Sequence, residues 1–440
     1  DTNTTGADLV GVGANALGAN TTGSDNVAVG KNALDAVTTS SNNTAVGSGA
    51  LGASTAEGNT AVGKEAMKTN TTGYRNVAVG KESLADNTTG NENVAIGNNA
   101  LEKNTTADNN VAIGFEALTS NTTGHSNTSV GRTSLNANTT GNSNTAVGMG
   151  SLESNTTANN NTAIGKNTLQ SNTTGASNVA AGFEALKTNT TGSSNIAIGT
   201  GALENNTTAS YNVAVGHDAG LSNTTGAENV AVGYQAFDAN TTGGTNVAVG
   251  YIALGANTTG SDNTAVGSYA LDANTTASNN TAFGSAALGA CTTGTQNTAV
   301  GRNAGSQLTT GNYNLFLGYD VGTDNSNGDR RFVIGQDFNG NTNNAVHIGA
   351  SGGHIRNDFL DDATWDQVSD VRKKTNIEDN SMGLEFINKL RTVIFNWKAP
   401  SEFPEEWESY NPNDTTPTTP NKKIGLIAQE VKEAIDELNI

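Results

Sequence analysis

The residues best suited to covalent chemistry lie near the C-terminus, where Ser369 and Asp370 precede three basic residues, Arg372, Lys373 and Lys374. A serine hydroxyl becomes a nucleophile when a neighbouring base accepts its proton. A lysine can act as that base when burial or nearby positive charge disfavours its ammonium form. Taken alone, such a basic cluster is more typical of a solvated surface beside the start of a helix. The surrounding motifs must therefore decide between the two interpretations.

Cysteine and histidine give no further reactive cluster. The single cysteine, Cys291, excludes an internal disulfide framework. The four histidines are scattered and show no metal-ligand spacing; they are His125, His217, His347 and His354. We therefore expect no metal and no cofactor.

Exposed aromatic side chains are the remaining candidates for binding. Tyr234 and Tyr251 each follow a glycine at the same point of two consecutive, similar stretches of sequence, and Phe115 and Phe183 occupy equivalent places. If these stretches are structural repeats, the two tyrosines lie near each other on one outer face and could form a carbohydrate platform. The alternative is that these aromatics simply cover neighbouring surface side chains.

A 17-residue repeat must position these residues. The unit reads Asn-Thr-Thr-Gly-x-x-Asn-Val-Ala-Val-Gly-x-x-Ala-Leu-x-x, and its second glycine recurs from Gly13 to Gly335. Of the nineteen intervals between these glycines, eighteen have the full length and one is a single position shorter. The short interval falls in the turn segment 54–59. The Asn-Thr-Thr triplets are formal N-glycosylation acceptors, but their composition favours turns whose side chains bond the local backbone.

The repeat predicts very short strands that are stacked coil upon coil. Val27-Ala28-Val29 is a β-favouring run closed by Gly30, and Ala33-Leu34 is a second apolar segment in the same unit. One unit has too few apolar side chains to bury a core alone, whereas stacked units bury them continuously. We therefore expect an all-β shaft, a parallel β-roll or β-solenoid, in which each unit supplies one or two strands.

The composition divides the chain into four segments. Residues 1–308 carry the regular repeats, 309–355 carry degenerate repeats, 356–368 form a linker, and 369–440 form a separate domain. All five prolines and all three tryptophans lie after residue 364. In the last segment, Leu384, Ile387 and Leu390 fit a helix, Val393, Phe395 and Trp397 alternate as a strand, and Val431, Ile435 and Leu438 fit a second helix. This pattern predicts a small α+β unit.

The charge balance limits the partners. With 22 basic and 41 acidic residues the formal net charge is −19, which disfavours nucleic acid and anionic membrane surfaces. No apolar run is long enough to span a membrane, so we expect no membrane insertion.

The shaft and the C-terminal segment resemble two known families. Phrases such as Asn43 to Gly47 and Asn93 to Gly97 resemble the head repeats of trimeric autotransporter adhesins, whose repeat is shorter than the one seen here. The segments 369–377, 390–398 and 424–431 resemble, in this order, the endosialidase-type C-terminal intramolecular chaperone that ends many phage tail fibres and tailspikes. This family usually continues beyond the last helix, so the resemblance implies a shortened domain here.

The chaperone resemblance implies roles for individual residues. Members of that family trimerise, template the upstream fibre and cleave themselves at a Ser-Asp junction. Carried over, Ser369 is the nucleophile, Lys374 is the base and Ser369-Asp370 is the scissile bond. The only enzymatic activity expected is this self-cleavage.

Together these features predict a homotrimeric phage tail-fibre or tailspike shaft, located in the virion, that attaches to a host cell-surface glycan or protein. One alternative is a trimeric adhesin on a bacterial cell surface. A second is a fragment of a polysaccharide-degrading tailspike, although the repeats show no recurring acidic pair.

Overall fold

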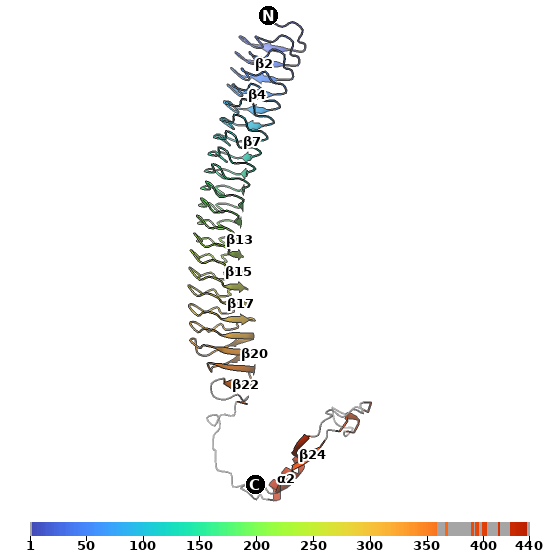
Figure 1. Cartoon of the computed structure of the whole chain (residues 1–440), viewed down its shortest axis with the longest axis vertical. Coiled ribbons are helices and arrows are strands. Elements are labelled where there is room, and N and C mark those ends of the chain that lie inside the picture. Colours follow the sequence, from blue (N-terminus) through green and yellow to red (C-terminus); the bar gives the residue numbers. More distant parts are fainter. Residues whose placement is uncertain are drawn as a thin grey trace. The chain divides into compact units, whose positions relative to one another are not determined.

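The computed structural model describes residues 2–358, 366–367, 389–390, 392–395, 398–402, 412–413 and 423–437. The chain divides into two compact units, Asp1–Val368 and Ser369–Ile440. In the first unit, successive repeats form successive coils that stack along one axis in chain order (Figure 1). This is a parallel β-solenoid of about twenty turns, as the repeat predicts.

Each regular coil contributes one three-residue strand. From β1 to β21, the strands of consecutive coils pair in parallel, so that Ala28, for example, lies between Gly11 and Ala45. The strands are β1 (Val10–Val12), β2 (Val27–Val29), β3 (Thr44–Val46), β4 (Thr60–Val62), β5 (Val77–Val79), β6 (Val94–Ile96), β7 (Val111–Ile113), β8 (Thr128–Val130), β9 (Thr145–Val147), β10 (Thr162–Ile164), β11 (Val179–Ala181), β12 (Ile196–Ile198), β13 (Val213–Val215), β14 (Val230–Val232), β15 (Val247–Val249), β16 (Thr264–Val266), β17 (Thr281–Phe283) and β18 (Thr298–Val300).

The core is a column of small side chains inside the coils. The middle residue of each strand from β2 to β18 points inward and is buried, as is the following Ala-Leu pair, such as Ala33 and Leu34. This pair forms no second strand. Leu34 adopts a left-handed backbone conformation (φ 50°), which turns the chain back toward the next coil while its side chain stays in the core. Each unit therefore provides one strand, rather than one or two.

Two ladders of buried asparagines run beside this apolar column. In the ladder that precedes the strands, Asn76 Nδ2 donates to Asn59 Oδ1 (3.3 Å) and to the carbonyl oxygen of Gly90 (2.9 Å). In the turn ladder, Asn87 Nδ2 donates to Asn70 Oδ1 (2.7 Å) and to the same carbonyl (2.9 Å). Buried amides need such partners, and here the repeat itself supplies them one coil away.

The contacts of the turn ladder show the structural role of the Asn-Thr-Thr triplets. Their asparagines are buried and bond the backbone three residues on, as the composition favours, and the first threonine of each triplet extends the network: Thr88 Oγ1 donates to the carbonyl oxygen of Thr105 (2.9 Å). In the folded shaft the Nδ2 atom of Asn87 already makes two bonds, so no space remains for a glycan on it.

The degenerate repeats end the solenoid with longer strands. β19 (Leu315–Gly322), β20 (Arg331–Asn339) and β21 (Ala345–Ala350) continue the parallel register. β22 (Gly353–Asp358) then reverses direction and pairs antiparallel with β21, and β23 (Asp366–Gln367) pairs antiparallel with β22. The reversal covers the last parallel strand, whose backbone would otherwise be a free edge.

The described part of the second unit is a small α+β arrangement. β24 (Thr392–Phe395) pairs antiparallel with β25 (Lys423–Leu426), the 3-10 helix η2 spans Pro400–Glu402, and α2 spans Ala428–Glu437. Lys389 Nζ lies 2.7 Å from Glu437 Oε2 and so connects the start of this unit to α2. β24 contains Val393 and Phe395 of the predicted strand, and α2 contains Val431 and Ile435 of the predicted second helix. The remaining residues of these two predictions, Trp397 and Leu438, and Leu384 and Ile387 of the predicted first helix lie outside the described residues. Among the helices that are described, none is long and apolar enough to cross a membrane.

Candidate functional site

The proposed cleavage residues lie outside the part of the chain that the structure describes. Ser369, Asp370 and Lys374 belong to the stretch 368–388, for which no placement is given. Their roles therefore remain predictions from the sequence. The shaft offers three further surfaces, each formed by side chains that recur from coil to coil.

The first surface is an aromatic column, defined here as His217, Tyr234, Tyr251 and Tyr269. The Tyr234 and Tyr251 rings stack with their centroids 5.3 Å apart at an angle of 10°, which confirms the predicted proximity. His217 stacks on the other side of Tyr234 (5.5 Å), and Tyr269 meets Tyr251 edge-on (5.3 Å). A hydrogen bond with Tyr251 raises the pKa of Tyr269. The rings thus cover part of one another's faces, which leaves less free ring face for a sugar than two separate tyrosines would.

The sequence pattern missed two members of this column. His217 takes the same place after its glycine as the tyrosines, so the repeat register could have placed it in the column. Tyr269 sits one residue further from its glycine, so the repeat register did not place it with the others. Elsewhere in the same row, basic residues accompany the aromatics: Arg132 lies 5.9 Å from the Phe115 ring and Lys166 lies 5.7 Å from the Phe183 ring. These aromatics do contact neighbouring surface side chains, as the alternative interpretation holds.

The second surface is the outer face of the parallel sheet. In strands β2 to β18 the first and third residues point outward, and these residues are Val, Thr, Ile, Ala or Phe in every strand. No charged residue occurs in any of the strands from β1 to β18. Ile164 and Ile198, for example, are 48% and 43% exposed. We call these outward first and third residues the apolar strip. It follows the shaft over seventeen coils, from β2 to β18.

The third surface is a notch at the one shortened interval of the repeat. Thr55 Oγ1 donates to the carbonyl oxygen of Thr71 (2.9 Å), which is the bond that the first threonine makes in other coils. The carbonyl oxygen of Ala56 accepts from Asn43 Nδ2 (3.0 Å), which is the bond that the residue after the second threonine makes in other coils. The residue missing from this coil is therefore the second threonine. The second threonines of the flanking coils, Thr39 and Thr72, are exposed.

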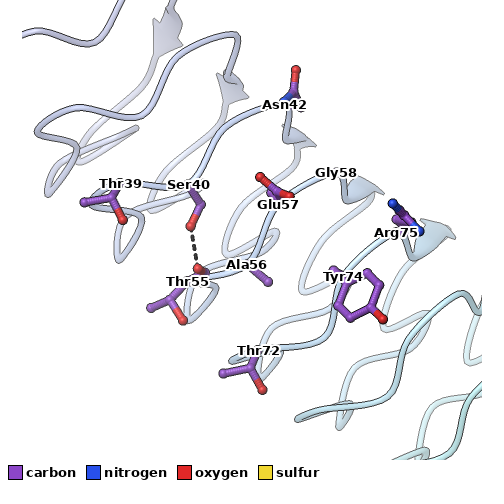
Figure 2. A pocket seen from close by; sticks show the side chains of 10 residues that line it. All are labelled: Thr39, Ser40, Asn42, Thr55, Ala56, Glu57, Gly58, Thr72, Tyr74 and Arg75. Carbon is purple, nitrogen blue, oxygen red and sulfur yellow. Dashed lines mark hydrogen bonds between the residues drawn. The ribbon is translucent and has the colours of Figure 1, made fainter.

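Figure 2 shows the notch between these flanking threonines. Its volume is about 720 Å³, and it is lined by Thr39, Ser40, Asn42, Thr55, Ala56, Glu57, Gly58, Thr72, Tyr74 and Arg75. Gly58 occupies the position that Asn42 and Arg75 hold in the flanking coils, so a second side chain is absent from the same coil. The Ser40 hydroxyl donates to the carbonyl of Thr55 and fixes one wall. From sequence, the missing residue marks only a tolerant turn. Because side chains stack in register from coil to coil, the loss of this one residue opens a polar cavity.

Comparison with known proteins identifies only the end of the chain. Residues 369–440 match the family model described as chaperone of endosialidase. No curated protein and no solved structure matches the chain. The molecule therefore combines a parallel β-solenoid shaft with a C-terminal segment that matches the chaperone of endosialidase.

Proposed function

We propose that the protein is the shaft of a homotrimeric phage tail fibre or tailspike, located in the virion, and that its C-terminal chaperone assists trimerisation and then cleaves itself between Ser369 and Asp370. Two features support this proposal. One is the match of residues 369–440 to the chaperone of endosialidase. The other is the apolar strip, which is the observation that carries the trimer.

We expect the apolar strip to be covered by other chains. A monomeric soluble protein rarely exposes a continuous apolar surface over seventeen coils, and such a surface usually marks an interface. The strip has the same period in every copy, so parallel copies can pack strip to strip over the whole shaft. The net charge of −19 opposes association of the chains, yet none of the strip residues is charged. The interface can therefore form without burying a carboxylate.

Light scattering tests the trimer directly. We expect a particle of three chains, each of 44.6 kDa before the proposed cleavage. Replacing Ile164 and Ile198 with lysine should place charges in the interface and shift the particle toward monomers. The matched control is Thr157→Lys with Thr191→Lys, which adds the same charge to exposed second threonines of the neighbouring turns. A wild-type monomer, or equal behaviour of the two pairs of variants, would contradict the proposed interface.

In this function the shaft spaces or presents a host-binding surface, whose partner is a cell-surface glycan or protein. The aromatic column is one candidate contact. Replacing Tyr234 and Tyr251 with serine should weaken binding to host cells while the particle remains trimeric. If host-cell binding is unchanged, the column is a structural surface and host contact occurs elsewhere.

A further inference from the structure

We propose that the notch in the shortened coil binds a neutral saccharide. The inference rests on the proposed attachment function and names a second place on the shaft where a host glycan could be held. It is carried by three observations on the described coils: a cavity of suitable size, unused hydrogen-bonding groups and an exposed aromatic ring.

The cavity has the size and polarity of a sugar site. A volume of about 720 Å³ lies within the usual range of small-molecule sites and leaves room for a short oligosaccharide. Hydroxyl groups of Thr39, Thr55 and Thr72 border it at intervals of one coil. Hydroxyls both donate and accept, which suits the hydroxyls of a sugar ring.

Glu57 supplies the unused hydrogen-bonding groups. In this row of the shaft, backbone N–H groups donate to a side chain one coil on: Tyr74 N donates to Asn91 Oδ1 (3.1 Å) and Ser24 N to Ser41 Oγ (3.0 Å). In the coil after that of Glu57, the residue at the corresponding position is Tyr74 rather than an asparagine or a serine. Among the described residues, the Glu57 N–H group has no hydrogen-bond acceptor. Its carboxylate is also exposed and without an ion pair in the described shaft. A bound sugar can satisfy both groups, because a carboxylate accepts from two adjacent hydroxyls.

Tyr74 supplies the aromatic surface. Its side chain is 41% exposed and forms part of the wall beside Glu57 and Arg75. The Arg75 guanidinium lies 5.6 Å from the ring centroid and 3.4 Å from Glu92 Oε1, which holds it beside the ring. An aromatic ring packs against the C–H face of a sugar, while the charged groups around it fix the hydroxyls.

The local charge selects a neutral sugar. Glu57 and Glu92 exceed Arg75 by one negative charge, and Arg75 is already paired with Glu92. The net charge of the chain also repels polyanions. An acidic glycan would meet an unpaired carboxylate in the notch with no free cation among the described lining residues to oppose it.

The decisive variant is the insertion of a threonine between Thr55 and Ala56. It restores the full-length coil and places a side chain where the notch is, as the second threonines do in the neighbouring coils. Tyr74→Ala and Glu57→Gln remove single binding groups. Tyr313→Ala is the matched control, because Tyr313 is similarly exposed (49%) and also lies beside an arginine, Arg330, but is outside the notch.

The full chain should be screened against neutral gluco-, galacto- and manno-oligosaccharides of two to four units by ligand-observed NMR and calorimetry. We expect one of them to bind with a dissociation constant on the order of 1 mM. The threonine insertion should abolish binding, Tyr74→Ala and Glu57→Gln should weaken it about tenfold or more, and Tyr313→Ala should leave it unchanged. Light scattering on each variant shows whether the trimer persists, so loss of the notch and loss of the fibre are distinguishable. Absence of binding across the panel, or binding that survives the insertion, would overturn the proposal.

Discussion

At the scale of single residues, the shaft depends on buried amides that find their partners one coil away. The exceptions show this. Cys291 replaces an asparagine of the turn ladder, and the Oδ1 atom of Asn274 on the preceding coil is buried without a hydrogen-bond partner. Asn20 Oδ1 has the same defect, because Val37 follows it in the ladder. An unsatisfied buried acceptor is costly, so these coils are weaker than their neighbours.

Replacing Val37 with asparagine should therefore stabilise the shaft. The new Nδ2 can donate to Asn20 Oδ1 as its equivalents do elsewhere, and the new Oδ1 can accept from the hydroxyl of Ser54 on the next coil, with a gain of about 1 kcal/mol. An asparagine in place of Cys291 should give no such gain, because Leu308 follows it in the ladder and would leave the new Oδ1 without a donor. Chemical denaturation of the wild type and of Val37→Asn measures the difference, with Val37→Ala, which adds no donor, as the control. A destabilised Val37→Asn variant would show that the ladder is not the limiting interaction at this coil.

The thiol of Cys291 should also be unreactive. Burial raises its pKa to about 11, so hardly any thiolate is present at neutral pH. A thiol reagent such as Ellman's should react with the native shaft far more slowly than with the unfolded chain. Fast labelling of the native protein would indicate that this coil opens readily.

His347 gives the end of the shaft a pH dependence. Burial, with the nearby charges of His354 and Arg356, lowers the pKa of His347 from 6.5 to about 4. Between pH 6.5 and pH 4 the imidazole of His347 is therefore protonated in the unfolded chain but not in the folded chain. The free energy of unfolding falls as the pH drops through this range. The loss is on the order of 3 kcal/mol per chain.

Thermal unfolding at neutral pH and at a pH just above the lowered pKa measures this effect. The His347→Gln variant should lose less stability between the two conditions than the wild type. His217→Gln is the control, because it replaces a half-exposed histidine far from this end of the shaft. Identical pH dependence in the wild type and His347→Gln would contradict the burial argument.

At the scale of the coil, the glycine that closes each strand is required by geometry. Gly165 has a φ of +134°, and a Cβ atom placed there would lie 2.5 Å from the carbonyl oxygen of Gly182. Gly165→Ala should therefore destabilise the shaft by several kcal/mol, since backbone of the next coil must move. Gly11→Ala is the control: Gly11 occupies a position where other coils have alanine, and its added Cβ meets nothing closer than 3.7 Å. Chemical denaturation of both variants tests the contrast.

The periodic part of this coil could be predicted from the sequence, whereas its exceptions could not. Alternation in Val27-Ala28-Val29 and the regular return of Gly30 predict the strand and its parallel neighbours. Alternation alone does not show that Ala28 points inward while the two valines face outward. Leucine is a poor choice for a left-handed backbone, so nothing in the sequence indicates that Leu34 turns the chain. The notch could not be predicted from the sequence either, because it arises from one missing side chain between Thr39 and Thr72 rather than from a motif.

At the scale of the whole molecule, the cleavage reaction is the main prediction. Expression should yield a shaft that ends at Ser369 and a separate fragment that begins at Asp370 and ends at Ile440. Cleavage should follow trimerisation and need no added protease. Ser369→Ala removes the hydroxyl and Lys374→Ala removes the base, and each should leave an intact chain that still forms trimers.

Intact mass and light scattering, measured together, check both parts of this prediction. If the wild-type chain forms trimers and stays intact, either further C-terminal residues are needed or the Ser369 and Lys374 assignment is wrong. A longer C-terminal sequence that restores cleavage would separate these two explanations.

The stacking of coils along one axis also determines how a single chain of the shaft would respond to tension. Each coil bonds only to the coils before and after it, and these bonds lie nearly parallel to the axis. A load applied to the two ends of the shaft therefore acts on all coil interfaces in series, and the interface with the fewest bonds ruptures first. The coils that lack a ladder partner, after Asn20 and after Asn274, are the weakest points. Each rupture should release one coil of the repeat, a gain in contour length of about 60 Å.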